Sequence, residues 1–400
     1  MSNVVPSNLC RLPWFGLSNE PTGLARPCCI FKGDISDENG VPYRVQTTSV
    51  KDIFNSKYMK DLRQQFRNNE RPSQCSTCWA DEAAGYTSKR QIYANVANGF
   101  IDDDSTDFID TEPDSPIEFQ LIMSNSCNLK CRSCGTSHSS LWATEAAKYP
   151  KLILQTNFPE GQSGRKDGEL WDGRFEWYKT LRRLEIVGGE PFYIKQWHQV
   201  WKELQELNYS KQIKLDMSSN CIIMYPDMIR ELSANFERVG LGISIDGLGP
   251  QFEYLRNPGK WDKTDANIKH YAELSKELHN FHCQATITVS WLNAWYLPEI
   301  VEYFNALQMK VWLNIIHYPP HMAIKNAPDR LKDAITKKWA TVNWGQYTND
   351  VQGIIATMNT SSPTIDEFRS FAHQITIIDN IRNESYLTSF SEIATYLYKI

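Results

Sequence analysis

The chain has 400 residues, enough for two or three domains, and its 41% hydrophobic and 12% aromatic content is typical of globular proteins with a large core. Its 42 Lys and Arg residues against 47 Asp and Glu residues give a net charge of −5, which provides no basic field for nucleic acid. No apolar stretch approaches the ~20 residues of a membrane span, and the first residues lack a signal peptide's basic and apolar segments, so we expect a cytoplasmic protein.

Residues 1–100 are rich in cysteine. This segment carries Cys10, Cys28, Cys29, Cys75 and Cys78. In a large chain without an export signal, clustered cysteines indicate metal binding rather than disulfides. Adjacent side chains diverge, so only one of Cys28 and Cys29 is expected to bind a metal. An acidic stretch follows at 101–116, with seven carboxylates and two prolines, which predicts a solvated linker.

Residues 117–320 alternate between short apolar runs and helical patterns, which predicts parallel βαβ units and an α/β fold. The expected strands are 117–123, 181–187, 212–217, 239–245, 283–289 and 311–317. The expected helices lie near 137–148, 196–207, 226–236, 264–278 and 297–307. Residues 321–400 show a helical pattern with no cluster of metal ligands, so we expect a helical C-terminal cap.

The run CNLKCRSC at 127–134 follows the first expected strand of this region. Its spacing brings the thiols of Cys127, Cys131 and Cys134 together. Iron–sulfur clusters are normally held by four Cys ligands, so three ligands would leave one iron of a [4Fe–4S] cluster open. A zinc site of the Cys3His type, with His138 as its fourth ligand, is the alternative.

Polar residues also follow the other expected strands, where the active sites of barrel proteins lie. The first group is Gly188, Gly189, Glu190 and Pro191, in which the glycines allow close backbone approach and the carboxylate can accept hydrogen bonds from an ammonium group. Polar turns or surface positions are the alternative for each of the others. These others are Ser219, Asn220, Ser244, Asp246, Arg256 and, more weakly, Asn293.

The cysteine spacing together with Gly188-Gly189-Glu190 resembles the radical S-adenosylmethionine (SAM) superfamily. The resemblance implies an open partial (β/α)6 barrel over 117–320, with a [4Fe–4S] cluster on Cys127, Cys131 and Cys134 as the catalytic group. It also implies that SAM binds the open iron and contacts the polar residues named above. One departure is Ser133, because this position is often aromatic in the superfamily and packs near adenine.

The N-terminal segment resembles the twitch and SPASM auxiliary-cluster domains of radical SAM enzymes. The shared features are Cys10 before Pro13 and Trp14, the Pro27-Cys28-Cys29 run and the later Cys75-x2-Cys78 pair. The resemblance implies an auxiliary [4Fe–4S] or [2Fe–2S] cluster on Cys10, Cys28, Cys75 and Cys78. Cys29 in place of Cys28, and zinc in place of iron, remain open. Cys221 and Cys283 are expected to bind no metal.

This resemblance implies an enzyme that cleaves SAM reductively to a 5′-deoxyadenosyl radical and abstracts a hydrogen atom from its substrate. The implied substrate is a peptide or protein side chain, with a carbohydrate or other small molecule as the alternative, and the implied reducing partner is a flavodoxin or ferredoxin. An iron–sulfur electron-transfer or binding protein without SAM chemistry is a hypothesis of another class. The SAM-binding motif after the second expected strand favours the enzyme.

Overall fold

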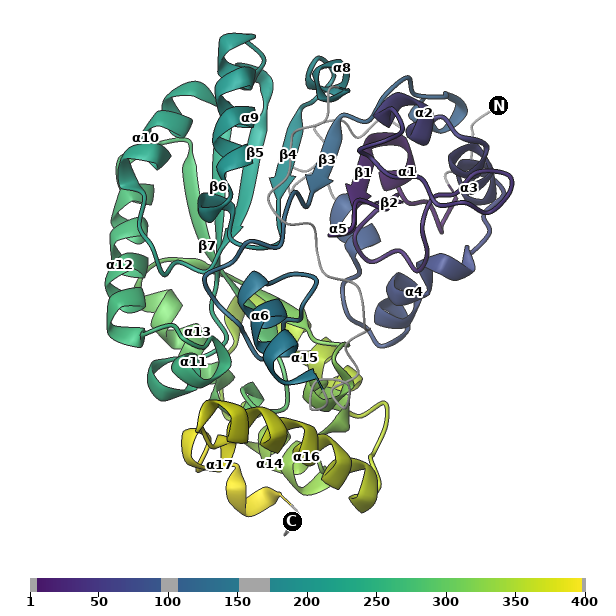
Figure 1. Ribbon diagram of the computed structural model, residues 1–400. Coiled ribbons are helices and arrows are strands. Elements are labelled where there is room, and N and C mark those ends of the chain that lie inside the picture. Colours follow the sequence, from purple (N-terminus) through teal and green to yellow (C-terminus); the bar gives the residue numbers. More distant parts are fainter. Residues whose placement is uncertain (1–5, 95–106, 151–172, 398–400) are drawn as a thin grey trace.

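One eight-stranded sheet organises the fold. The computed structural model describes residues 6–94, 107–150 and 173–397 (Figure 1). The strand order is β2-β1-β3-β4-β5-β6-β7-β8, and every neighbouring pair is parallel except β1 and β2. The sheet runs from the edge strand β2 to the edge strand β8 and is not closed. This open, mostly parallel sheet confirms the predicted α/β class.

All six predicted strands are present, in chain order across the sheet. They are β3 (Glu118–Leu121), β4 (Arg183–Ile186), β5 (Lys214–Ser219), β6 (Arg238–Ser244), β7 (Phe281–Val289) and β8 (Lys310–Ile315). In β6, Val239, Leu241 and Ile243 are buried while the residues between them are partly exposed. This period of two leaves one face of the strand in the core and one partly open.

Helices connect the strands, as the alternation predicts. The structure has α6 (Ser140–Lys148), α8 (Arg174–Tyr178), α9 (Lys195–Glu206), α10 (Pro226–Asn235), α11 (Gly249–Leu255), α12 (Trp261–Glu277) and α13 (Leu297–Ala306). In α9 the buried residues Trp197, Val200, Trp201 and Leu204 recur at helical spacing, so one face of this helix enters the core. The five helices expected between the strands are confirmed by α6, α9, α10, α12 and α13.

The N-terminal segment adds two strands that the sequence pattern did not predict. β1 (Gly16–Asn19) pairs in parallel with β3, and β2 (Ala25–Arg26) pairs antiparallel with β1. Both strands are short and carry no clear alternation of apolar and polar residues. The helices of this segment are α1 (Leu12–Phe15), α2 (Val50–Phe54), α3 (Lys57–Arg67), α4 (Ser76–Ala83) and α5 (Lys89–Ala94).

The N-terminal segment also reaches the opposite edge of the sheet. Tyr86, between α4 and α5, donates a hydrogen bond from its hydroxyl to the carbonyl oxygen of Leu313 in β8. Asp81 in α4 lies 3.8 Å from His317, just past β8. The segment therefore contacts the sheet next to β3, through β1, and again at β8.

The described part of the acidic stretch contacts this N-terminal segment. Residues 101–106 lie outside the described residues. Glu112 forms ion pairs with Arg63 at 3.0 Å and Arg67 at 2.8 Å, both on α3. The Trp14 indole also donates to the carbonyl oxygen of Thr111 at 3.3 Å. The domain boundaries at 100, 116 and 320 stay predictions.

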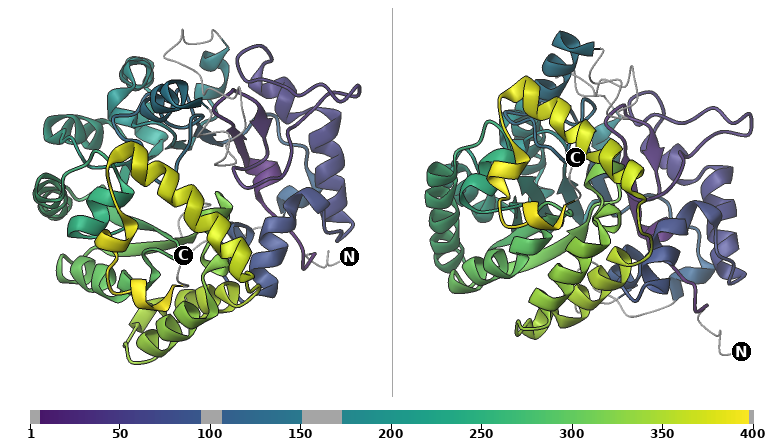
Figure 2. Two further views of the ribbon diagram at one scale, coloured as in Figure 1. Left: turned by 60° about the horizontal axis from the view of Figure 1, so that its bottom comes forward. Right: turned by 90° about the horizontal axis from the view of Figure 1, so that it is seen from below.

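The C-terminal region is helical, as expected. It comprises α14 (Asp329–Trp339), α15 (Thr348–Met358), α16 (Ile365–Arg382) and α17 (Tyr386–Ser389), and α16 is the long yellow helix in both views of Figure 2. A capping box of Thr364 and Glu367 begins α16. Asn383, with a φ of 52°, ends it. No helix in the described ranges has both the length and the apolar character needed to cross a membrane.

Candidate functional site

The three cysteines of the 127–134 run lie on one loop between β3 and α6. Polar groups order this loop: the Cys127 amide donates to Ser140 Oγ at 3.1 Å, and the Leu129 amide donates to Cys127 Sγ at 3.4 Å. The Cys134 amide donates to the Cys131 carbonyl oxygen at 3.0 Å. The loop is therefore bound to the first turn of α6 and folded back on itself.

These thiols are chemically suited to a cationic group. Burial, followed by the neighbouring Cys131 thiol, raises the pKa of Cys134 to about 12 and raises that of Cys127 further. Thiolates packed together in a buried place repel one another, so they need a positive centre to stay ionised. An iron–sulfur cluster, which is held by thiolates, meets this need.

The zinc alternative with His138 receives no support from the geometry. His138 Nδ1 lies 2.9 Å from Ser137 Oγ, so this nitrogen is engaged by a hydroxyl rather than by a group shared with the thiols. Among residues 6–94, 107–150 and 173–397, no three His, Cys, Asp or Glu side chains are arranged to hold a single metal ion.

The Gly188–Pro191 motif packs directly against the cysteine loop. Gly188 and Gly189 have φ values of +81° and +58°, which favour glycine. The Glu190 amide donates to the carbonyl oxygen of Ser126 at 2.8 Å, next to Cys127. Pro191 begins a 3-10 turn in which Pro191 and Phe192 are buried. The predicted SAM motif and the predicted cluster loop are thus in contact.

Glu190 in turn binds the polar pair at the end of β5. Its carboxylate accepts hydrogen bonds from Ser219 Oγ and from the Asn220 amide, both at 2.8 Å. Burial raises the pKa of Glu190 to about 7 despite these two donors. Asn220 Nδ2 also lies 4.0 Å from Cys127 Sγ. Three motifs that are far apart in the sequence therefore meet at one place.

Arg256 lies on the other side of the cysteine loop. Its guanidinium forms a 2.8 Å ion pair with Asp246, and its Nη1 lies 3.9 Å from Cys131 Sγ. Arg256 Nε is buried without a hydrogen-bond partner in the described structure, and so is Asn125 Oδ1 near the same loop. Buried polar atoms are normally paired, so these two fit a site that takes a polar ligand.

Two of the predicted residues, Ser244 and Asn293, differ in how the structure uses them. Ser244 ends β6 on its partly exposed face, in register with Thr286. Asn293 is instead used by the fold: its Oδ1 accepts from the Ser290 amide at 2.7 Å, and its Nδ2 donates to the Asp246 carbonyl oxygen at 2.9 Å. Asn293 thus supports the loop of Asp246 rather than facing a ligand.

The close approach at Gly189 leads to a prediction. A Cβ at this position would lie 2.5 Å from the Ser126 carbonyl oxygen, whereas a Cβ at Gly345, with a similar φ of +53°, would meet nothing within 4 Å. Gly189→Ala is expected to be more destabilising than Gly345→Ala, which carries only the backbone strain of about 1 kcal/mol. Urea unfolding of both variants measures the difference. Equal losses of stability would contradict the contact.

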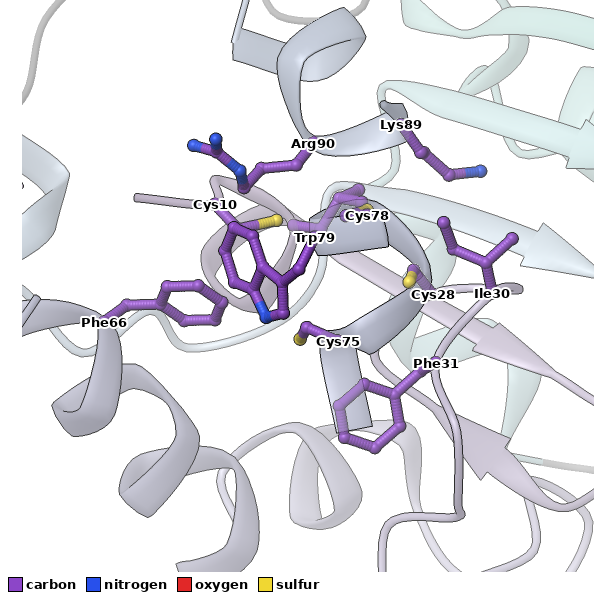
Figure 3. Close-up of a pocket in the computed structure, with 11 residues that line it drawn as sticks. Cys10, Cys28, Ile30, Phe31, Phe66, Cys75, Cys78, Trp79, Lys89 and Arg90 are labelled. Carbon is purple, nitrogen blue, oxygen red and sulfur yellow. The ribbon is translucent and has the colours of Figure 1, made fainter. Parts of the chain in front are cut away.

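A second candidate site lies in the N-terminal segment. Figure 3 shows Cys10, Cys28, Cys75 and Cys78 around one cavity of about 340 Å³, part of which is open to solvent. Cys10 precedes α1, Cys28 follows β2, and the other two lie at the start of α4. The apolar wall of the cavity consists of Leu12, Ile30, Phe31, Phe66 and Trp79. The four predicted auxiliary ligands therefore line the same space.

The electrostatics of this cavity link the same four thiols. Burial, then the thiols of Cys28, Cys75 and Cys78, raises the pKa of Cys10 well above its ordinary value. Burial raises the pKa values of Cys28 and Cys75 to about 12. Burial likewise raises the pKa of Cys78. Buried thiols packed together need a positive centre to stay ionised, and an iron–sulfur cluster held by thiolates meets this need.

The structure separates the two adjacent cysteines. Cys28 lines the cavity, whereas Cys29 is exposed and accepts a hydrogen bond from Lys89 Nζ at 3.2 Å. This arrangement supports Cys28 as the ligand. Sequence reasoning did not identify Lys89 and Arg90 as residues of this cavity, because only the fold brings α5 beside α4.

The adjacent residues Cys28 and Cys29 allow a matched experiment. Cys28→Ala is expected to remove the auxiliary cluster, which is about four irons per chain if it is [4Fe–4S], while Cys29→Ala keeps it. Iron and acid-labile sulfide are measured after anaerobic reconstitution of both variants. Loss of iron in Cys29→Ala with retention in Cys28→Ala would reverse the assignment.

Comparison with known families identifies the N-terminal segment. Residues 10–79 match the family described as SPASM: Iron-sulfur cluster-binding domain. The match begins at Cys10 and includes all four predicted ligands, so the resemblance of this segment to a SPASM domain is confirmed. It favours an iron–sulfur cluster over zinc at the N-terminal cavity. No curated protein matches the chain.

Solved structures with similarity to the chain include a histidine-tagged form of anSMEcpe with bound AdoMet, at 16% identity and a TM-score of 0.38. SuiB from Streptococcus suis has 16% identity and a TM-score of 0.35. Native anSMEcpe with bound AdoMet and the Kp18Cys peptide has 14% identity and a TM-score of 0.32. The matches cover 56%, 57% and 66% of this chain and 58%, 48% and 61% of those chains, in the same order.

Proposed function

We propose that this protein is a radical SAM enzyme with an auxiliary iron–sulfur cluster. The observation that carries the proposal is the contact among three separate motifs at the ends of β3, β4 and β5. The Glu190 amide donates to Ser126 beside Cys127, and the Glu190 carboxylate accepts from Ser219 and Asn220. An electron carrier has no need of two further polar motifs held against its cysteine loop.

In this proposal Cys127, Cys131 and Cys134 hold a [4Fe–4S] cluster, which when bound supplies the electron that cleaves SAM to a 5′-deoxyadenosyl radical. Glu190, raised in pKa to about 7 by burial, accepts hydrogen bonds from the amino group of SAM in its ionised form. Gly188 and Gly189 let the motif pack closely against Ile122 and the Ser126 carbonyl oxygen, which keeps Glu190 beside the cysteine loop. Arg256, whose Nε has no hydrogen-bond partner in the described structure, is the proposed donor to the carboxylate of SAM.

The N-terminal site is assigned to Cys10, Cys28, Cys75 and Cys78. Four thiol ligands occupy a cluster fully, so direct substrate binding to its iron is not proposed. The apolar cavity and the paired Arg90 shield it, since Arg90 forms a 2.6 Å ion pair with Glu82 and stacks over Trp79. Its proposed role is to accept an electron from the substrate or to shape the substrate pocket.

The proposed substrate is a peptide or protein side chain, which the resemblance to the twitch and SPASM proteins implies. A carbohydrate or another small molecule is the alternative substrate class. We place the enzyme in the cytoplasm, where thiols are kept reduced, with a flavodoxin or ferredoxin as reductant.

The decisive experiment is anaerobic reconstitution with iron and sulfide, followed by dithionite and SAM and by chromatography for 5′-deoxyadenosine. The expected result is 5′-deoxyadenosine from a chain that holds roughly seven or eight irons. Adding candidate peptides extends the assay to substrate-dependent cleavage. A chain that holds iron at both sites but neither binds nor cleaves SAM would favour the electron-transfer hypothesis instead.

A further inference from the structure

A buried arginine lies inside the cysteine loop. Arg132, between Cys131 and Cys134, is 2% exposed and forms ion pairs with Asp379 at 2.6 Å and Glu384 at 2.5 Å. Its guanidinium carbon lies 4.0 Å from the centre of the Tyr254 ring. Asp379 is in the last turn of α16 and Glu384 follows its end, so opposite charges bind the cysteine loop to the C-terminal helix.

A second group of contacts ties α16 to the helix that follows the cysteine loop. Arg382, the last residue of α16, forms a 2.7 Å ion pair with Glu145 on α6, and Glu145 also pairs with Lys130 of the loop. Arg382 lies 4.8 Å from the Trp142 ring, and the Trp142 indole donates to the Cys131 carbonyl oxygen at 2.7 Å. These contacts therefore connect the end of α16 to the cysteine loop, partly through α6.

The same two carboxylates also hold the segment that carries Arg256. Tyr254 donates to Asp379 at 2.8 Å, and Asn257 donates to Glu384. The backbone amide of Arg132 donates to the Leu255 carbonyl oxygen at 2.7 Å. Arg256, placed between these contacts, is the residue whose guanidinium lies 3.9 Å from Cys131 Sγ. The end of α16 therefore orders both sides of the site.

These charges are not needed simply to attach α16. The helix already buries Phe368, Ala372 and Ile375 in the core. A buried ion pair adds little net stability compared with apolar residues of the same shape, because both charges lose their hydration. What such a pair can add is a defined position for the groups that it joins, which in this chain are α16 and the cysteine loop.

We propose that Arg132, Asp379 and Glu384 form a C-terminal clamp that positions the cysteine loop and Arg256 for the cluster and SAM. Arg132 and Asp379 are positioning residues in this clamp, acting through Cys131, Cys134 and Arg256. The inference rests on the proposed function and deepens it, because it makes the helical C-terminal region part of the SAM site rather than a cover. Residues that orient ligand groups in this way typically change affinity or activity by about 10- to 100-fold when replaced.

The test compares Asp379→Asn with Asp366→Asn on the same helix. Asp366 pairs with Arg369 at the surface, where both side chains are more than half exposed, so its loss leaves the clamp intact. Three readouts are taken: amide exchange of residues 127–134 in the metal-free chain, the electron paramagnetic resonance signal of the reduced clusters before and after SAM, and SAM affinity by calorimetry. Arg132→Lys, which keeps the charge but loses the fork, is measured in parallel.

The expected result is faster amide exchange of the loop, a smaller SAM-induced change of the resonance signal and about 10- to 100-fold weaker SAM binding in Asp379→Asn. Arg132→Lys should lie between this variant and the native chain, and Asp366→Asn should match the native chain. If Asp379→Asn does not fold, Glu384→Gln, whose side chain is 19% exposed, replaces it.

The clamp is overturned if Asp379→Asn and Arg132→Lys show the native amide exchange rates for residues 127–134 and the native affinity for SAM. Failure of the proposed function looks different, because the native chain itself would then bind no SAM. The amide exchange of the metal-free chain would still decide whether the clamp holds the loop.

Discussion

Cys127→Ala is expected to abolish formation of 5′-deoxyadenosine while leaving the iron of the N-terminal site in place. Cys127 is the predicted ligand that lies beside two of the other motifs: its neighbour Ser126 accepts from the Glu190 amide, and Asn220 Nδ2 lies 4.0 Å from its sulfur. With two thiols left, the loop can no longer hold a three-ligand cluster. Chromatography of the product and iron analysis of the same sample measure both parts of the prediction.

Cys283→Ala is the matched control for this experiment. Cys283 lies in β7, is partly buried and contacts neither group of predicted ligands among the described residues. Its replacement is expected to leave iron content and SAM cleavage unchanged. Cleavage at a near-native rate in Cys127→Ala, or loss of iron from Cys283→Ala, would remove the basis for assigning the cluster to the 127–134 loop.

Arg183→Met is expected to lower the free energy of unfolding by about 3–5 kcal/mol. Arg183, on β4, pairs with Glu118 at 3.0 Å and with Asp216 at 2.8 Å. It also donates to the Tyr93 hydroxyl at 2.7 Å, and Tyr93 donates to Glu118. Because these groups are largely buried, removing the arginine leaves Glu118 without its counter-charge, whereas Asp216 keeps its 2.9 Å ion pair with Arg238. Urea unfolding of the metal-free chain measures the loss.

Arg230→Met is the control for the charge itself. Arg230 pairs with Glu277 on the surface, where the two side chains are 42% and 55% exposed, so its loss should cost no more than about 1 kcal/mol. Adding Glu118→Gln to Arg183→Met should recover part of the stability, since one unpaired charge is removed. The network joins α5 to the sheet through Tyr93. Equal losses of stability in Arg183→Met and Arg230→Met would contradict this role of the buried network.

The sequence was sufficient to predict the strands β3 to β8, the helices between them and the residues of each candidate motif. The six strands from β3 to β8 follow from short apolar runs, and α9 follows from its helical spacing, because each pattern reflects burial of one local face. The spacing of Cys127, Cys131 and Cys134 predicts that the three thiols bind one metal cluster, since these residues lie on one loop. The N-terminal cysteines were likewise identified as a set, and the family match over residues 10–79 supports that interpretation.

The sequence could not show the added strands or the choice between Cys28 and Cys29. β1 has four residues and β2 has two, too few for a periodic pattern, and the pairing of β1 with β3 joins parts of the chain about a hundred residues apart. The exposure of Cys29 and its contact with Lys89 depend on where α5 packs.

The sequence by itself therefore predicted which residues could bind a cluster and SAM, and it determined the strands β3 to β8 and the helices between them, because spacing and periodicity are local properties. Only the tertiary structure decided which of these groups meet. It placed Glu190 between the cysteine loop and Asn220, assigned Asn293 to the support of Asp246, and bound Arg132 to Asp379 of α16. Such contacts depend on packing between distant segments. No local sequence pattern encodes the buried ion pair between Arg132 of the cysteine loop and Asp379 of α16.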